Sequence, residues 1–192
     1  MPDQQLTARG AATRQRILDA ATREFAEHGI AGARVERVVA AARTNKAQLY
    51  AYFGNKDGLF DAIFFASLER IVNVVPIDAT DLADWAVRLY DEYLENPELI
   101  RLATWTRLER RPTGHLVADR LDEHKLQAIA QAQADGLVRD GDPFDVMAMV
   151  IAMSMAWSPV SNVYAATAGE PAETHARRRE FLRDSVRRAV AP

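Results

Sequence analysis

The chain has 192 residues and no cysteine, which excludes disulfides, thiol nucleophiles and thiolate metal sites and fits a reducing compartment. Charged residues make up 27% and hydrophobic residues 48%, a composition that excludes the disordered and fibrous classes. The net charge of −3 conceals an asymmetry, because residues 1–70 hold 10 Lys and Arg against 8 Asp and Glu, whereas residues 71–192 hold 14 against 19.

The chain opens on the polar stretch MPDQQLTARG, which lacks the apolar segment of a signal peptide, so we expect a cytoplasmic protein. Beyond this stretch, apolar residues recur at spacings of three and four and seldom alternate, which predicts helices throughout. A first helix is predicted from about Thr13 to Gly29, because glycine suits the left-handed cap that often ends a helix. A short second helix follows over residues 35–42, although Arg34 stands where a capping Ser or Thr is favoured.

A third helix is predicted to begin at Asn45, whose side chain forms a variant capping box with Gln48. Its inward face is expected to consist of Leu49, Tyr52 and Phe53. The other side of this helix is polar, so the pattern predicts one buried and one exposed face.

Asn55 is expected to cap a fourth helix that ends before Pro76. The remaining pattern predicts five more helices, over residues 80–96, 97–110, 116–135, 142–157 and 171–190. The fourth of these begins a longer apolar helix, which we expect Pro159 to kink. The longest apolar run, residues 146–157, is shorter than the roughly 20 residues that a membrane span requires, so it indicates a buried helix.

Two short helices joined by a tight turn, the second with a polar outer face, are typical of a helix-turn-helix. In this arrangement Gln48 can form paired hydrogen bonds with adenine, and Lys46 can donate to O6 and N7 of guanine. Ala47 is small and lets the backbone approach the bases. Tyr50 can donate to a phosphate oxygen, and Lys56 lies in a first helical turn, where the helix dipole already favours an anion.

The stretch TRQRILDAATREFAEHGIAGARVERVVAAARTNKAQLYAYFGNKDGLF, from Thr13 to Phe60, resembles the N-terminal domain of the tetracycline-repressor (TetR) family of transcriptional regulators. The resemblance covers about a quarter of the chain, and its most specific part is KAQLYAYFGNKDGLF. It implies an all-α homodimeric regulator, with a three-helix helix-turn-helix domain over residues 1–54 and a helical-bundle domain for effector binding and dimerisation over residues 55–192. The candidate DNA-contacting residues are Arg34, Arg43, Thr44, Asn45, Lys46, Ala47, Gln48, Tyr50, Tyr52 and Lys56.

The turn between the second and third helices departs from the family pattern, which has Gly followed by an aliphatic residue. This chain has Arg43 and Thr44 instead. A residue other than Gly in a left-handed turn costs on the order of 1 kcal/mol, so we expect the turn to differ in shape. Arg43, and Arg34 at the uncapped helix start, are available for added phosphate contacts.

The effector is expected to be small and apolar or aromatic. Candidate ligand-contacting residues are Thr104, Trp105, His124, Met149, Met153 and Trp157, although methionines and tryptophans at helical spacing are also ordinary core residues. Apolar stripes on the helices over residues 142–157 and 171–190 predict a two-fold interface that buries upward of about 2,000 Å².

Other functional classes have little support in the sequence. No Walker A, G-x-G-x-x-G or G-x-S-x-G motif is present, and the four histidines lack metal-ligand spacing, so we expect no catalytic residue, no metal and no cofactor. The alternative to a DNA-binding repressor is a helical small-molecule-binding or adaptor protein whose N-terminal lobe binds protein instead of DNA. A steep fall in affinity for duplex DNA with rising salt separates the two.

Overall fold

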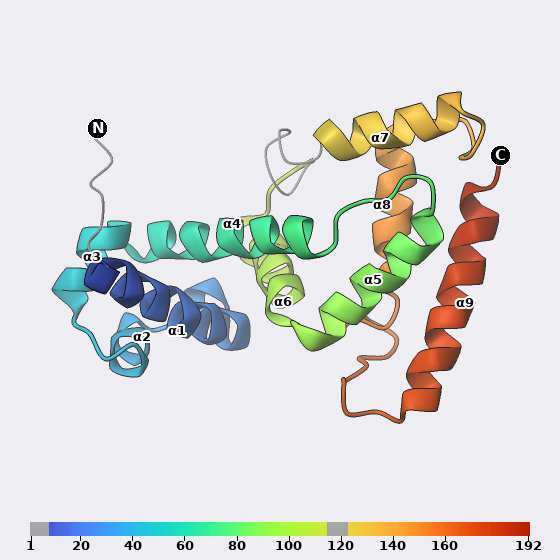
Figure 1. Ribbon diagram of the computed structural model, residues 1–192. Helices are drawn as coiled ribbons and strands as arrows, with labels where there is room; N and C mark the ends of the chain where they lie inside the picture. The colour runs from blue at the N-terminus through green and yellow to red at the C-terminus, as the bar shows by residue number, and fades with distance from the viewer. Residues whose placement is uncertain (1–7, 115–122) are drawn as a thin grey trace. The chain divides into compact units, whose positions relative to one another are not determined.

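The computed structural model describes residues 8–114 and 123–192 of the chain (Figure 1). Every regular element in these two ranges is helical, which confirms the all-α expectation. No helix in the described part of the chain is long and apolar enough to cross a membrane. By compactness the chain divides into two units, the first comprising residues up to 69 together with 101–111, and the second residues 70–100 and 112–192.

The first unit begins with three helices, α1 (Ala8–Gly32), α2 (Val35–Ala41) and α3 (Lys46–Phe53). The helix α1 starts earlier than the expected Thr13, and its helical backbone is interrupted at Gly29, which has the expected positive φ, at 75°. The start and end of α3 are those predicted, because Asn45 caps its first turn and Gly54 follows its last residue with a φ of 74°.

The next helix, α4 (Lys56–Val74), follows α3 after a tight connection. The Asn55 side chain accepts a hydrogen bond from the backbone N–H of Gly58 at 2.8 Å, which confirms Asn55 as the cap. A Cβ at Gly58 would lie only 2.3 Å from the carbonyl oxygen of Phe53, so the connection requires glycine there. Because α4 contributes to both units, the division into domains at residues 54 and 55 remains a prediction about function.

The core of the first unit is apolar and comes from all four helices. Its fully buried side chains include Ile17, Ala21, Phe25, Val38, Leu49, Leu59, Phe60 and Ile63. The rings of Phe25 and Phe60 meet edge to face with centroids 5.3 Å apart. This core fixes α3 against α1 through its buried face and leaves the opposite face of α3 exposed.

A later segment returns to the first unit. The helix α6 (Glu98–Trp105) continues as a π-helical turn over Thr106–Arg110, and its residues from Arg101 onward belong to the first unit. The helix predicted over residues 97–110 is therefore present, but its last turn is wider than an α-helix. The segment ends at Arg111, which has a left-handed φ of 51°.

The second unit is a bundle of α5 (Leu82–Glu95), α7 (Glu123–Ala134), α8 (Pro143–Ser154) and α9 (Ala172–Val190). As Figure 1 shows, α5 packs against α8 and α9, and α7 packs against α8. Side chains of Asp81 and Asp142 cap α5 and α8 through backbone N–H groups of Asp84 and Phe144. Trp85 is buried in this bundle and donates its indole N–H to the Val75 carbonyl at 3.2 Å.

Two of the helices predicted for this unit have other bounds, or bounds only partly described, in the structure. The expected kink at Pro159 is wrong, because α8 ends at Ser154, well before the proline. The Ser154 hydroxyl donates to the Ile151 carbonyl at 2.6 Å, and successive turns then replace the helix, with Ser158 N–H bonded to the Met155 carbonyl. Of the helix expected over residues 116–135, the part before Glu123 lies outside the described residues.

Candidate functional site

The exposed face of α3 carries the side chains expected to read DNA. Lys46, Ala47, Gln48 and Tyr50 are all exposed, whereas Leu49 is fully buried. The cap fixes the first turn, because Asn45 Oδ1 accepts the backbone N–H of Gln48 at 2.9 Å. The sequence thus places the polar side chains on one surface of a helix whose other face is buried in the core.

The turn between α2 and α3 keeps the left-handed backbone in spite of its sequence. Arg43 has a φ of 50°, and its N–H donates to the Ala40 carbonyl at 3.2 Å. The expectation of a different turn shape is therefore wrong. The tight connection between the two helices determines the backbone, and Arg43 carries strain on the order of 1 kcal/mol that a glycine would avoid. Its side chain is exposed.

The N-terminus of α2 has a cap that the sequence did not reveal. Glu24 of α1 is buried, and its Oε1 accepts the backbone N–H of Arg34 at 2.8 Å. The same carboxylate accepts the Arg37 Nε–H at 2.8 and 2.9 Å. Burial acts to raise the pKa of Glu24, but the hydrogen bonds from Arg37 and from the Arg34 backbone outweigh it, so its pKa lies below the usual value. The Arg34 side chain remains exposed.

Two of the expected base-reading side chains have polar partners within the same surface. Lys46 Nζ lies 2.5 Å from Oε1 of Glu36, the second residue of α2, and both side chains are exposed. The Thr44 hydroxyl donates to Gln48 Oε1 at 2.6 Å, which leaves the amide N–H₂ of Gln48 directed to other acceptors. Glu36 was not among the expected contact residues, because nothing local in the sequence pairs it with Lys46.

Tyr52 and Lys56 form bonds to the backbone of α1. The Tyr52 hydroxyl donates to the Gly10 carbonyl at 3.2 Å, and Lys56 Nζ donates to the Ala31 carbonyl at 3.1 Å. Both residues are half-buried, whereas Tyr50 is 40% exposed. Within the surface, Tyr50 is thus more accessible to a phosphate than Tyr52.

The segment 101–111 holds the end of α1 through backbone groups. Glu109 accepts the N–H groups of Ile30 and Ala31 at 3.0 and 2.6 Å. Arg101 Nε and Trp105 Nε1 both donate to the Ala26 carbonyl, at 2.8 and 3.2 Å. These contacts join residues nearly eighty positions apart, and sequence reasoning missed them.

The structure distributes the six candidate ligand-contacting residues over both units. Thr104 and Trp105 belong to the first unit. In the second unit His124 is exposed on α7, and Met149 of α8 is 58% exposed. Met153 and Trp157 are half-buried.

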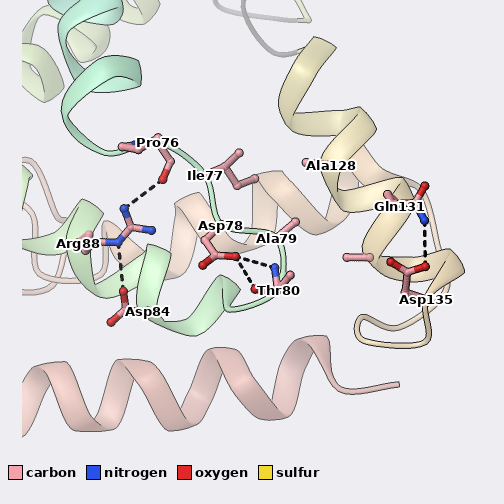
Figure 2. A pocket seen from close by; sticks show the side chains of 11 residues that line it. Pro76, Ile77, Asp78, Ala79, Thr80, Asp84, Arg88, Ala128, Gln131 and Asp135 are labelled. Atoms are coloured by element: carbon pink, nitrogen blue, oxygen red, sulfur yellow. Dashed lines mark hydrogen bonds and ion pairs between the residues drawn. The ribbon is translucent and has the colours of Figure 1, made fainter.

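A hollow of about 720 Å³ opens in the second unit between the connection after α4, the start of α5, and α7 (Figure 2). Its lining mixes polar and apolar side chains. The Arg88 side chain binds Asp84 at 3.1 Å and the Pro76 carbonyl at 3.1 Å, and Gln131 donates to Asp135 at 2.9 Å. None of the six candidate ligand residues lines this hollow.

Two family models match the chain. Residues 17–63 match the model for bacterial regulatory proteins of the tetR family. Residues 81–188 match the model for the tetracyclin repressor-like C-terminal domain. Together they cover most of both units.

Individual proteins agree with the family models. The HTH-type transcriptional repressor SCO4008 of Streptomyces coelicolor is 39% identical over 148 residues, which cover 74% of this chain and 77% of that protein. The crystal structure of the putative transcriptional regulator SCO4942 from the same species has a TM-score of 0.78 at 37% identity and covers 93% of this chain and 98% of that one. The crystal structure of AibR in complex with isovaleryl coenzyme A and operator DNA is similar in fold, with a TM-score of 0.62 at 20% identity over 94% and 98% of the two chains.

Proposed function

The chain belongs to the tetR family of bacterial regulatory proteins, and we propose that it represses transcription as a ligand-responsive homodimer bound to a near-palindromic operator. The adaptor alternative is disfavoured, since the relative of highest identity reported above is itself a transcriptional repressor. A regulator of this kind acts in the cytoplasm, where its operators are, and needs no catalytic residue, metal or cofactor.

The observation that carries the proposal is the exposed polar face of α3 on a rigid apolar support. Lys46, Gln48 and Tyr50 all project from one short helix whose Leu49 is fully buried. An α-helix with such a face fits the major groove of duplex DNA, and the small Ala47 between the polar residues permits close approach.

The side chains of this surface divide into two groups. Lys46 and Gln48 have the chemistry to read guanine and adenine edges. Tyr50, Lys56 and the exposed Arg34 and Arg43 provide phosphate contacts, which position the protein without reading sequence. Asn45 contributes as the helix cap, and Thr44 contributes by holding the Gln48 amide. The Tyr52 hydroxyl is bonded to the Gly10 carbonyl, so its contribution is to hold α1 against α3.

The dimer forms through α8 and α9. Both helices expose large apolar side chains in the single chain, with Met149 at 58% and Phe181 at 64% exposure. Covering such side chains with a second copy gives a two-fold interface, and the two copies of α3 then meet major grooves about one duplex turn apart or a multiple of it.

The response to an effector follows from the continuity of α4. This helix carries Lys56 in the first unit and continues past Glu69 into the second. A small apolar or aromatic effector that binds one conformer of the helical domain more tightly shifts the population of α4 positions and thereby operator affinity. AibR, which is similar in fold, was crystallised with isovaleryl coenzyme A and operator DNA, so a protein of this fold can bind a small molecule and DNA together.

The test is selection of bound duplexes from a random pool, followed by titration of the best duplex at several salt concentrations. We expect an inverted repeat and an affinity that falls steeply with salt, because counterions are released from phosphates. Binding of protein partners with no enriched duplex would instead support the adaptor alternative. A thermal-shift screen of apolar and aromatic compounds, followed by duplex titration with each hit, tests the effector part.

A further inference from the structure

Glu36 of α2, the ion-pair partner of Lys46, has no role among the proposed phosphate and base contacts. Lys46 Nζ and Glu36 Oε1 are 2.5 Å apart, and the two side chains are 52% and 65% exposed. The pair lies on the same surface as Gln48 and Thr44, which are also hydrogen-bonded to each other. The Glu36 carboxylate lies beside the reading residues of α3 and would repel a phosphate. In a complex with DNA, it would therefore contact a group other than the DNA backbone.

The bonding of the pair keeps both groups charged and leaves each with spare capacity. The hydrogen bond from Lys46 holds the pKa of Glu36 below its usual value, and the same bond raises the pKa of Lys46. An ammonium group has three donors and a carboxylate has two acceptor oxygens. After their mutual bond, Lys46 still offers donors and Glu36 still offers acceptors on adjacent points of one surface.

A G·C base pair presents the complementary arrangement in the major groove. Guanine offers the acceptors O6 and N7, and cytosine offers the N4 amino donor next to O6. The two edge atoms O6 and N4 are hydrogen-bonded to each other at about 2.9 Å, which is close to the separation of the Lys46 and Glu36 atoms. Donor and acceptor of the protein pair can therefore face acceptor and donor of one base pair at matched spacing.

We infer that Glu36 is a specificity-determining residue that reads cytosine N4 while its ion-pair partner Lys46 reads guanine of the same base pair. This inference rests on the proposed DNA-binding function. The pair discriminates orientation as well as composition, because a C·G pair would set the carboxylate against O6 and the ammonium against the amino group. It also lowers affinity for unrelated DNA, since Lys46 can reach a phosphate only by leaving Glu36 unpaired near the polyanion.

The ion pair of Glu24 with Arg37 in the same unit differs from that of Glu36 with Lys46 in burial and in its bonds to the backbone. Glu24 is 9% exposed and caps the start of α2, so its carboxylate has no access to a groove. Glu36 is mostly exposed, and the one backbone hydrogen bond of its carboxylate is to its own residue. Its role in the folded protein alone is small, because exposed ion pairs contribute little to stability.

The test is duplex selection from a random pool with the wild-type chain and three variants of the full-length protein. Glu36→Ala removes the cytosine acceptor, and Glu27→Ala removes a carboxylate that is 72% exposed and pairs with His28 instead of Lys46. The third variant combines Glu36→Lys with Lys46→Glu and reverses the pair. Thermal unfolding of all four proteins checks that each is folded.

We expect the wild-type chain to select G·C at one position of each half-site and Glu36→Ala to lose about tenfold in that preference while gaining affinity for unrelated duplex. Glu27→Ala should retain the preference, and the reversed pair should select C·G at that position. If Glu36→Ala keeps the preference for G·C and changes affinity for all duplexes only as much as Glu27→Ala does, this inference is wrong and the proposed function stands. A wild-type chain that enriches no duplex overturns the proposed function and this inference with it.

Discussion

The two units place their candidate functional residues in different ways. In the first unit the DNA-contacting candidates lie within residues 34–56, and short-range caps and one apolar core bring them to one surface. Of the ligand-contacting candidates, Thr104 and Trp105 lie in the first unit, and the other four lie in α7, in α8 and in the turns after α8. None of the six lines the described hollow of about 720 Å³. A surface built by neighbouring residues can be read from sequence, whereas a cavity built by distant helices cannot.

The largest expected effects come from truncating a buried aromatic side chain in the core of either unit. Phe25→Ala and Trp85→Ala each remove an aromatic side chain that is 1% exposed, so each should lower the free energy of unfolding by about 3–5 kcal/mol. If the units carry separate functions, Phe25→Ala should weaken duplex binding and Trp85→Ala should weaken the effector response. Chemical denaturation and duplex titration measure both effects.

Val163→Ala is the control for these two variants, because Val163 is 93% exposed and its loss should change stability by less than about 0.5 kcal/mol. Equal loss of duplex binding in both core variants, under conditions where both remain folded, would show that the two units do not act separately.

The buried carboxylate of the first unit gives the next largest effect. Glu24→Gln weakens three hydrogen bonds to a charged group and should cost about 1.5–3 kcal/mol at neutral pH. Because the pKa of Glu24 is depressed in the folded protein, its contribution is present above the ordinary value of 4.5 and is lost as the pH falls through the folded pKa. Wild-type stability should therefore fall more steeply below about pH 4.5 than that of Glu24→Gln, a difference that denaturation at several pH values detects.

A smaller effect is expected at the connection between α3 and α4. Gly58→Ala would set a Cβ 2.3 Å from the Phe53 carbonyl oxygen, so it should cost about 1–3 kcal/mol and weaken duplex binding by moving α3. Gly32→Ala is the matched control, since a Cβ there meets only the His28 Cβ at 3.5 Å. Thermal melts that show equal loss in both variants would contradict the requirement for glycine at position 58.

The smallest effect is expected at Arg43, where substitutions separate the backbone strain of the α2–α3 turn from the charge of the side chain. Arg43→Gly relieves a left-handed φ of 50° and should stabilise the protein by up to about 1 kcal/mol. If Arg43 contacts a phosphate, the same variant should bind every duplex more weakly, with a shallower dependence on salt. Arg43→Ala keeps the strain and removes the charge, so it should weaken binding without the gain in stability.

Several features of the first unit followed directly from local sequence. The start of α3 at Asn45, its end at Gly54 and the cap at Asn55 were predicted, because each depends on residues within one helical turn. The exposed positions of Lys46 and Gln48 followed from the same periodicity. Such features depend on residues that lie within about one helical turn of one another.

Most of the features that sequence reasoning missed depend on contacts between different elements, and one depends on a misleading local pattern. Glu24 caps α2 from a different helix, and Glu109 binds the end of α1 from a segment 79 residues beyond Ile30. The left-handed backbone at Arg43 was missed because packing of the flanking helices overrides the residue's own preference. The end of α8 at Ser154 was missed because the apolar pattern continues beyond it to Trp157.

The central claim is that the exposed face of α3 reads duplex DNA, and comparison of Gln48→Ala with Tyr50→Phe tests it most directly. Titration with the selected duplex and with every single-base variant of its half-site should show that Gln48→Ala relaxes choice at one position, by about 1–3 kcal/mol. Tyr50→Phe should weaken binding to all duplexes by a similar factor. If both variants gave the same loss regardless of sequence, or none, α3 would not be the reading element.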